Sequence, residues 1–270
     1  MTTAEMLRLA VEQSAEDIGC QAEDFERNQN VIVSLRIGQN ARKYVKQPLP
    51  AVFVSYGCNV VAAASEDLIE PISEYASRYT FYHLFETPAL YWLNERIAPS
   101  GYGVCLMAEY FLPCTEHLSV LPCNYVLRVL GPLDFQELYL PQWSNALCRD
   151  RRDLDVLGVG AYDGDVLVGL AACSADCENM WQIGVDVLPA YRRKGIASAL
   201  TTRLAQEILS RGKVPFYCCA WSNIRSSRVA LRSGFAPAWV EMTVRPMDAI
   251  LEMNAQRTDG DIPSGTIQQS

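Results

Sequence analysis

Three cations stand directly before a single glycine in the stretch Leu188–Leu200, which reads "LPAYRRKGIASAL". The cations are Arg192, Arg193 and Lys194. Small and apolar residues follow Gly195 with the spacing of a helix. The first turn of a helix offers unpaired backbone N–H groups and about half a positive charge, and a glycine lets an anion approach the backbone closely. The stretch therefore predicts a site for a pyrophosphate or a 3′-phosphorylated nucleotide, with a solvated basic loop as the alternative.

Two common phosphate-binding loops do not fit this stretch. No Gly-Lys-Ser/Thr follows, as a P-loop requires, and one glycine is not a Gly-x-Gly-x-x-Gly motif. The helix after the glycine carries apolar residues every four positions, namely Ile196, Leu200, Leu204 and Ile208. This spacing predicts a helix that packs one face on a sheet and begins near Gly195.

The elements that must position this site are predicted in the second half of the chain. Asp163-Gly164 between two apolar runs predicts a β-hairpin. A helix from 134 to 147 is expected, kinked or broken at Pro141. The expected helix after Gly195 continues to Ser210, and a short one lies in 223–235. Further strands are expected in the segments 125–130, 181–188, 214–221 and 239–244.

The first half of the chain predicts mixed α and β structure without recognisable chemistry. It begins with an amphipathic helix whose buried stripe is expected to include Met6, Leu9, Ala10 and Ile18. The patterns that follow predict a strand–turn–strand in 51–64, helices in 66–79 and 87–99, and a stretch broken by Pro and Gly in 98–113.

Composition excludes several functional classes. Half of the 270 residues are hydrophobic and 20% are charged, which is typical of globular proteins. No apolar run approaches the roughly 18 residues of a membrane span, and the acidic start does not resemble a signal peptide. The formal net charge of −8 argues against nucleic-acid binding, which requires a basic face, and is compatible with a cationic small molecule.

Cysteine and histidine usage predicts a reduced protein without a metal. The cysteine pairs at 173/177 and 218/219 lack a second ligand pair at zinc-site spacing. With only His83 and His117, a histidine-based metal site or catalytic triad is hard to build. We therefore expect a cytoplasmic protein with no metal, no nucleic-acid or membrane partner, and a homo-oligomer as an open alternative.

The segment Arg192–Ala197, "RRKGIA", resembles the Gln/Arg-x-x-Gly-x-Gly/Ala signature of the GNAT superfamily of acyl-CoA-dependent N-acetyltransferases. The order of elements around it is also similar to that family. Asn223, followed by Gly234-Phe235, resembles the family's Asn…Gly-Phe segment. The agreement is collinear over roughly residues 124 to 246, which makes it far more specific than the short signature.

The resemblance implies an α/β (α+β) fold in three parts. Residues 123–247 would form a GNAT domain with a mixed, mostly antiparallel sheet, splayed central strands and flanking helices. Residues 1–122 would form an N-terminal α/β domain of unknown role, with a divergent second GNAT half as one interpretation. Residues 248–270 would be a polar C-terminal tail.

The resemblance also implies acetyl-CoA as co-substrate and assigns the residues that would bind it. The pantetheine arm would pair with the backbone of Val185, Asp186 and Val187. Asn223 would either touch the cofactor or cap the following helix. The phosphates would lie on the backbone and side chains of Arg192, Arg193, Lys194, Gly195, Ile196, Ala197 and Ser198.

The sequence departs from the family at the catalytic positions. Ala230 stands where many members have a tyrosine that protonates the leaving thiolate, and the fourth strand lacks the usual glutamate. The candidate bases are Glu178, Asp186 and Glu241, each with a solvated surface acid as the alternative. The candidate acids are Tyr217 and Ser226, with core packing and helix capping as alternatives.

Three hypotheses about function follow from the sequence. The first is an N-acetyltransferase that moves acetyl from acetyl-CoA to a primary amine of an unidentified acceptor, either a small molecule or a protein N-terminus, directly in a ternary complex. The second is a degenerate module that binds acyl-CoA as a sensor. The third is an interaction scaffold whose basic loop holds no ligand. Trp181, Trp221 and Trp239 are candidates for an acceptor pocket or for the core.

Overall fold

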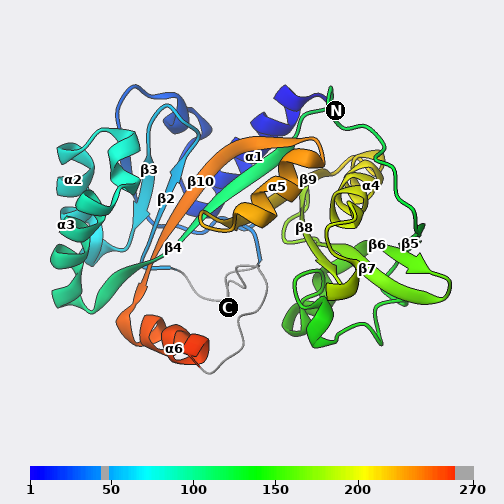
Figure 1. The fold of residues 1–270 in the computed structure, drawn as a ribbon. Helices are drawn as coiled ribbons and strands as arrows, with labels where there is room; N and C mark the ends of the chain where they lie inside the picture. Colours follow the sequence, from blue (N-terminus) through cyan, green and yellow to red (C-terminus); the bar gives the residue numbers. More distant parts are fainter. Residues whose placement is uncertain (44–48, 259–270) are drawn as a thin grey trace. The chain divides into compact units, whose positions relative to one another are not determined.

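The computed structural model of the chain describes residues 1–43 and 49–258 (Figure 1). These residues form two compact units. Unit 1 consists of residues 1–9 and 110–237, and unit 2 consists of residues 10–109 and the described residues from 238 onward. The units divide at 109/110 and 237/238, within the two long strands Tyr102–Pro113 and Phe235–Pro246, whereas the sequence predicted a division at 122/123 and 247/248.

Unit 1 contains five neighbouring strands in the order β9-β8-β7-β6-β5. The pairs β5·β6, β6·β7 and β7·β8 are antiparallel, and β8·β9 is parallel. This is the predicted mixed, mostly antiparallel sheet. The strands of this unit are β5 (Val126–Leu130), β6 (Asp155–Asp163), β7 (Val166–Ser174), β8 (Met180–Val187) and β9 (Val214–Ala220).

The predicted hairpin joins β6 to β7. Asp163 pairs with Val166, so the loop is the two residues Gly164-Asp165. Gly164 has a φ of 59°, in the left-handed region that favours glycine. The Asp-Gly signal is therefore confirmed, because this backbone conformation is the one that tight hairpin turns require.

Helix α4 (Ile196–Ser210) covers one face of β6, β7 and β8 and is drawn in yellow in Figure 1. Its predicted apolar face is buried: Ile196, Leu200, Leu204 and Ile208 are each at most 2% exposed. A Cβ at Gly169 on β7 would lie only 2.9 Å from Ile196 Cγ2 and 3.0 Å from Leu200 Cδ1. Glycine at this position therefore lets the helix approach the sheet closely.

The remaining helix of unit 1 is α5 (Ile224–Arg232), between β9 and β10. It is short and strongly amphipathic, with Ala230 buried and charged residues on the other side. Gly234, with a φ of 85°, follows the helix and ends it as predicted.

Unit 2 contains strands in the order β1-β3-β2-β10-β4 and the two helices α2 and α3, drawn in cyan in Figure 1. Its core includes Phe53, Tyr75 and Met242, all fully buried. The elements are α1 (Thr3–Ile18), whose first residues belong to unit 1, β1 (Val31–Ser34), β2 (Ala51–Ser55), β3 (Val61–Ala64), α2 (Ile69–Arg78), α3 (Thr87–Ile97), β4 (Tyr102–Pro113), β10 (Phe235–Pro246) and α6 (Met247–Thr258).

Three sequence expectations about elements are wrong. Residues 134–147 form turns and a 3-10 helix at Pro141–Trp143 in place of an α-helix, because Pro141 removes a backbone donor and interrupts the pattern. The Pro- and Gly-broken stretch contains the twelve-residue strand β4, which begins after Pro99 and Gly101, includes Gly103 and ends at Pro113. The first residues of the polar tail form helix α6, and the rest of the tail lies outside the described residues.

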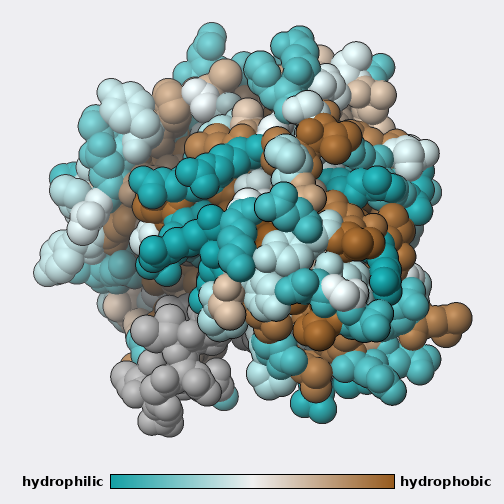
Figure 2. All heavy atoms as spheres, turned by 45° about the vertical axis from the view of Figure 1, so that its right-hand side comes forward, coloured by the Kyte–Doolittle hydropathy of each residue, from teal (hydrophilic) through white to brown (hydrophobic). Residues whose placement is uncertain are grey.

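The surface mixes polar and apolar side chains. On the face drawn in Figure 2, bands of hydrophilic side chains alternate with smaller apolar groups, as is usual for protein surfaces in contact with water. Within the described ranges, we find no helix with the length and hydrophobicity needed to cross a bilayer.

Candidate functional site: a cavity between two diverging strands

The parallel strands β8 and β9 pair only over their first halves. Their register runs from Met180↔Val214 to Ile183↔Tyr217 and ends there, while β8 continues to Val187 along β7. A cavity of about 650 Å³ lies where the two strands separate, lined by the end of β8 and by Tyr217 and Cys218 of β9. The splayed central strands implied by the resemblance are therefore present, and one edge of β8 is open to a ligand in the cavity.

The first turn of α4 forms part of the cavity wall. Gly195 is the residue before the helix and has a φ of 79°. A Cβ at this position would meet no atom within 4 Å, so glycine is required by the backbone conformation and leaves the helix end accessible. Arg193 also has a positive φ, 65°, which costs a non-glycine residue about 1 kcal/mol. The N–H groups of Ile196, Ala197 and Ser198 stand at the helix end where donors lack intrahelical acceptors.

Five arginines line the cavity. Arg192 and Arg193 come from the loop before α4, and Arg225, Arg228 and Arg232 come from one face of α5, at positions i, i+3 and i+7. In the described part of the chain, none of the five forms a salt bridge with a carboxylate. A chain of net charge −8 thus concentrates unneutralised positive charge at one cavity.

Most residues that the resemblance assigned to acetyl-CoA line this cavity, and one does not. Lys194 points elsewhere: its Nζ donates to Tyr125 Oη at 3.2 Å and lies 4.8 Å from the centre of the Tyr191 ring. Arg192 donates from Nε to the Val187 carbonyl at 3.0 Å, which ties the loop to the end of β8. The assigned residues that line the cavity are Val185, Asp186, Val187, Arg192, Arg193, Gly195, Ile196, Ala197, Ser198 and Asn223.

The three arginines of α5 were missed by the sequence analysis. Their signal was present, because the spacing R-x-x-R-x-x-x-R places them on one helix face. The pattern alone did not indicate whether that face is turned to solvent or to a ligand cavity. Only the packing of α5 beside α4 and β9 decides this.

The geometry confirms the helix-cap role of Asn223 and is compatible with a cofactor contact. It is the N-cap of α5, and its side chain accepts a hydrogen bond from the Ser226 N–H at 3.1 Å. It also lines the cavity. A cap and a ligand contact are compatible because a side-chain amide can make several hydrogen bonds.

Asp186 holds a neighbouring segment in place. Its carboxylate accepts hydrogen bonds from Asn145 N at 2.8 Å, Asn145 Nδ2 at 2.6 Å and Ala146 N at 3.0 Å. Gly184, two residues earlier on the same strand face, leaves room for the Asn145 carbonyl, which would lie 1.8 Å from a Cβ. Burial raises the pKa of Asp186, although these hydrogen bonds favour its ionised form. The expectation of a solvated surface acid is wrong for this residue, which is 8% exposed.

Tyr217 and Ser226 form a pair in the cavity wall. Their hydroxyl oxygens lie 2.7 Å apart, and both residues line the cavity. Burial raises the pKa of Tyr217, so its hydroxyl stays protonated and can donate a hydrogen bond. The two candidate acids are thus brought together, next to the end of the paired part of β8 and β9.

The other two candidate bases do not line the cavity. Glu178 is exposed and stands before Met180, at the opposite end of β8 from the cavity residues. Glu241 belongs to unit 2, where it is 3% exposed and accepts hydrogen bonds from Arg42 Nη2 at 2.7 Å and Trp239 Nε1 at 2.8 Å. The expectation of a solvated acid is therefore correct for Glu178 and wrong for Glu241.

Position 230, where many relatives have tyrosine, is fully buried in the core of unit 1. Cys218 lines the cavity, and its sulfur accepts a hydrogen bond from Gln182 Nε2 at 3.1 Å. Trp181, Trp221 and Trp239 are not among the lining residues. These three tryptophans therefore do not form the wall of this cavity.

Residues 114–238 match the family model described as GNAT acetyltransferase. The match agrees with the resemblance seen in the sequence, and the matched residues include every residue that lines the cavity. No curated protein matches the sequence.

Several solved structures resemble the chain. A GNAT-family protein from Novosphingobium aromaticivorans is 18% identical, with a TM-score of 0.40 over 53% of this chain and 66% of that protein. A GCN5-related N-acetyltransferase-like protein from Streptococcus suis is 19% identical, with a TM-score of 0.41 over 56% and 65%. A GCN5-related N-acetyltransferase from Kribbella flavida is 16% identical, with a TM-score of 0.47 over 90% and 95%. The match thus spans slightly less than two thirds of the first two proteins, and the assignment rests on the family model.

Proposed function

We propose that the protein is an N-acetyltransferase that binds acetyl-CoA in the cavity of unit 1 and transfers the acetyl group to a primary amine. The observation that carries the proposal is the convergence of five unneutralised arginines, a helix N-terminus and an open strand edge on one cavity of about 650 Å³. Coenzyme A combines a pyrophosphate, a 3′-phosphate and an amide-containing arm, so each of these features has a counterpart in one ligand.

The phosphates divide between two parts of the cavity in this proposal. The N–H groups of Ile196, Ala197 and Ser198 would donate hydrogen bonds to the pyrophosphate, because the helix dipole and unpaired donors favour an anion there. The arginine face of α5 would receive the 3′-phosphate. The open edge of β8 from Gly184 to Val187 would pair with the amides of the pantetheine arm, as an added strand does.

The chemistry needs no covalent enzyme intermediate. The amine nitrogen attacks the thioester carbonyl carbon, a C–N bond forms, the C–S bond breaks, and the sulfur leaves as a thiolate that is finally protonated. The nitrogen loses its proton to water or to a carboxylate. Holding an amine against an activated thioester in a fixed orientation supplies much of the acceleration in such reactions.

Tyr217 and Ser226 would stabilise the leaving thiolate by hydrogen bonding. A tyrosine whose pKa is raised by burial is a weaker proton donor than an ordinary thiol, so complete proton transfer from Tyr217 to the thiolate is unfavourable. A hydrogen bond from its hydroxyl to the developing negative charge remains favourable and is worth about 1.5–3 kcal/mol. Solvent would then supply the proton.

The proposal is tested by release of free thiol from acetyl-CoA with a panel of amines, together with calorimetry of CoA binding. We expect saturable CoA binding and thiol release with at least one amine. Tyr217→Phe should lower kcat about 10–100-fold and change the CoA affinity little, because the hydroxyl acts on the leaving group. Absence of CoA binding would contradict the proposal.

Dephospho-CoA separates the two phosphate contacts. It lacks the 3′-phosphate and keeps the pyrophosphate, so it should bind about tenfold more weakly than CoA if the α5 arginines receive the 3′-phosphate. Equal affinities for CoA and dephospho-CoA would show that the α5 arginines do not bind the 3′-phosphate, without contradicting the pyrophosphate site.

A second candidate function is an acyl-CoA sensor without catalysis. It is favoured by Ala230, which is buried where relatives have the acid, and by the engagement of Asp186 in three hydrogen bonds. Tight CoA binding without thiol release for any amine would favour this sensor.

We also propose that the protein works in the cytoplasm on a small amine. All ten cysteines are free thiols, as expected in a reducing compartment. The acidic net charge is compatible with attraction of a cationic acceptor.

A further inference from the structure

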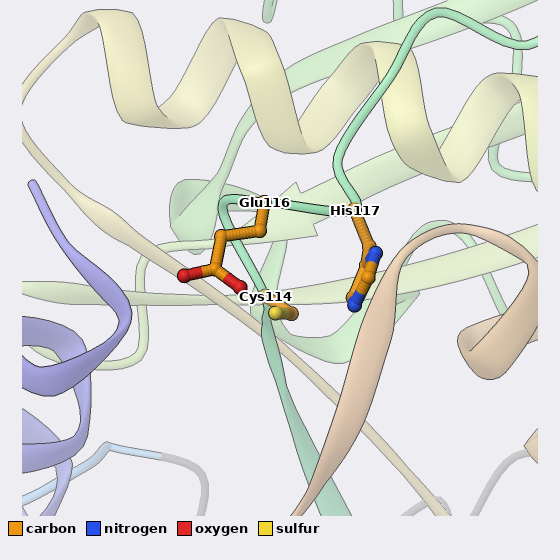
Figure 3. A group of neighbouring side chains, drawn as sticks. All are labelled: Cys114, Glu116 and His117. Carbon is orange, nitrogen blue, oxygen red and sulfur yellow. The ribbon is translucent and has the colours of Figure 1, made fainter.

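We propose that Cys114, Glu116 and His117 form a zinc-binding site. A Cys114 sulfur, a Glu116 carboxylate oxygen and a His117 ring nitrogen all lie within 4.8 Å of one another. In the view of Figure 3 the sulfur lies between the carboxylate and the imidazole, and all three side chains come from the segment that follows β4. None of the three lines the acetyl-CoA cavity, so this site does not rest on the proposed acetyl transfer.

The main chain of this segment is held in place without a metal. The Cys114 N–H donates to the Gly234 carbonyl at 2.8 Å, and the His117 N–H closes a turn onto the Cys114 carbonyl at 2.9 Å. The Thr115 N–H donates to Thr3 Oγ1 at 3.1 Å. Because these bonds already order the backbone, metal binding does not carry the entropic cost of ordering it.

The spacing of the ligand atoms is close to what zinc requires. Zinc bonds are roughly 2.3 Å to sulfur and roughly 2.0–2.2 Å to nitrogen and oxygen, so ligand atoms around one tetrahedral zinc lie roughly 3.3–3.8 Å apart. Glu116 and His117 are exposed and can rotate, whereas Cys114 is half-buried. Small side-chain rotations therefore bring the three atoms from within 4.8 Å to bonding distance.

The types of ligand favour zinc over other common cations. Magnesium and calcium prefer sets made only of oxygen atoms, whereas thiolate and imidazole suit zinc. The thiol loses its proton to solvent on binding, so the thiolate and the carboxylate together balance the two positive charges of the ion. Three protein ligands leave a fourth position for water.

The segment 114–117 also lies near the C-terminal end of helix α5, and the C-terminal end of a helix favours a cation. Gly234 follows the C-terminus of α5, and a Cβ there would lie 2.7 Å from the His117 carbonyl oxygen. The C-terminal end of a helix carries partial negative charge, which stabilises a nearby cation. The sequence predicts no metal site because it lacks paired cysteines at zinc spacing and has only two histidines, whereas this group uses one residue of each type.

The test is titration of the full-length, tag-free protein with cobalt, followed by displacement with zinc. A cobalt–thiolate bond produces a charge-transfer absorption in the near ultraviolet, so its appearance reports on the cysteine directly. We expect one equivalent of cobalt, displaced by one of zinc. Cys114→Ser should abolish the thiolate band, and His117→Ala and Glu116→Gln should each weaken zinc binding about tenfold or more.

Matched variants control for adventitious binding. Cys58→Ser removes an exposed thiol, and His83→Ala removes the other histidine of the chain; neither should change the band or the affinity. Zinc should raise the melting temperature of the wild type and not that of Cys114→Ser, whose melting without metal reports on its folding. A thiolate band that persists in Cys114→Ser, or one that disappears in Cys58→Ser, would overturn the proposal.

Discussion

A buried arginine of unit 2 and the arginines that line the cavity of unit 1 have opposite environments. In unit 2 the Arg42 side chain is 4% exposed and forms ion pairs with Asp17 and Glu241. In unit 1 the cavity arginines are exposed, and no carboxylate among the described residues forms a salt bridge with them. Arg42 is neutralised by two buried carboxylates, whereas the charges of the cavity arginines are not balanced by a carboxylate of the described residues.

Asp155 gives the converse case, a buried carboxylate without a salt bridge among the described residues. It is 2% exposed and accepts hydrogen bonds from Tyr139 Oη at 3.1 Å and Cys148 N at 3.0 Å. Burial raises its pKa to about 7, against partial opposition from these hydrogen bonds. Burial alone therefore does not decide the state of an ionisable group; the presence of a partner of opposite charge does.

The largest effect on stability is expected from replacing the buried Arg42. Replacement by methionine would leave Asp17 and Glu241 buried without their cation, which should lower the free energy of unfolding by about 3–5 kcal/mol. Urea denaturation measures this change. The control is Arg203→Met, which breaks a partly exposed pair with Glu207 and should cost at most about 1 kcal/mol. Similar losses in both variants would contradict the structural role of Arg42.

Asp155→Asn should change the pH dependence of stability. The pKa of Asp155 is raised in the folded state from 3.8 to about 7, so its stabilisation is fully present below pH 3.8 and is lost as pH rises through 7. Asparagine keeps the acceptor oxygen and does not ionise. The stability of the wild type relative to this variant should fall with rising pH, by up to roughly 4 kcal/mol between pH 4 and pH 8. If urea denaturation gives a difference in unfolding free energy between the two proteins that does not change with pH, the raised pKa of Asp155 would be contradicted.

The cavity arginines should matter for ligand affinity and little for folding. Arg228→Gln and Arg232→Gln should each weaken CoA binding about tenfold, because a charge-assisted hydrogen bond to phosphate is lost. Their unfolding free energies should change by less than about 0.5 kcal/mol. Lys194→Gln is the matched control, since this cation stands in the signature but does not line the cavity. Calorimetry would refute the distinction if Lys194→Gln weakened binding as much as the arginine variants.

The smallest effect is expected at Gly195, where a methyl group has space but the backbone is left-handed. Gly195→Ala should cost about 1 kcal/mol of stability and weaken CoA binding several-fold, because the methyl group stands where the anion approaches. Gly164→Ala is matched to it, with a φ of 59° and equal open space in the hairpin turn. It should show the same thermal destabilisation with unchanged CoA affinity. If both variants bind CoA alike, the helix end near Gly195 does not hold the phosphates.

Much of unit 1 could be predicted because its local signals agree with its tertiary structure. The Asp-Gly hairpin, the four-residue spacing in α4 and the glycine after α5 each depend on short-range geometry that neighbouring residues dictate. The predictions failed where long-range packing decides. The end of the segment 134–147 is bound at Asn145 and Ala146 by Asp186 on β8, and the role of Glu241 depends on Arg42, 199 residues away.

The sequence by itself determined the glycine-containing turn before α4, the similarity of the segment that contains it to GNAT acetyltransferases, and the alanine at position 230, because each of these depends on residues that are close in sequence. Only the tertiary structure decided that β8 and β9 separate after Ile183 and Tyr217, that the arginines of α5 face the resulting cavity, and that Lys194 does not. The physical reason is that charge, accessibility and pKa depend on which groups surround a side chain, and those groups come from distant parts of the chain.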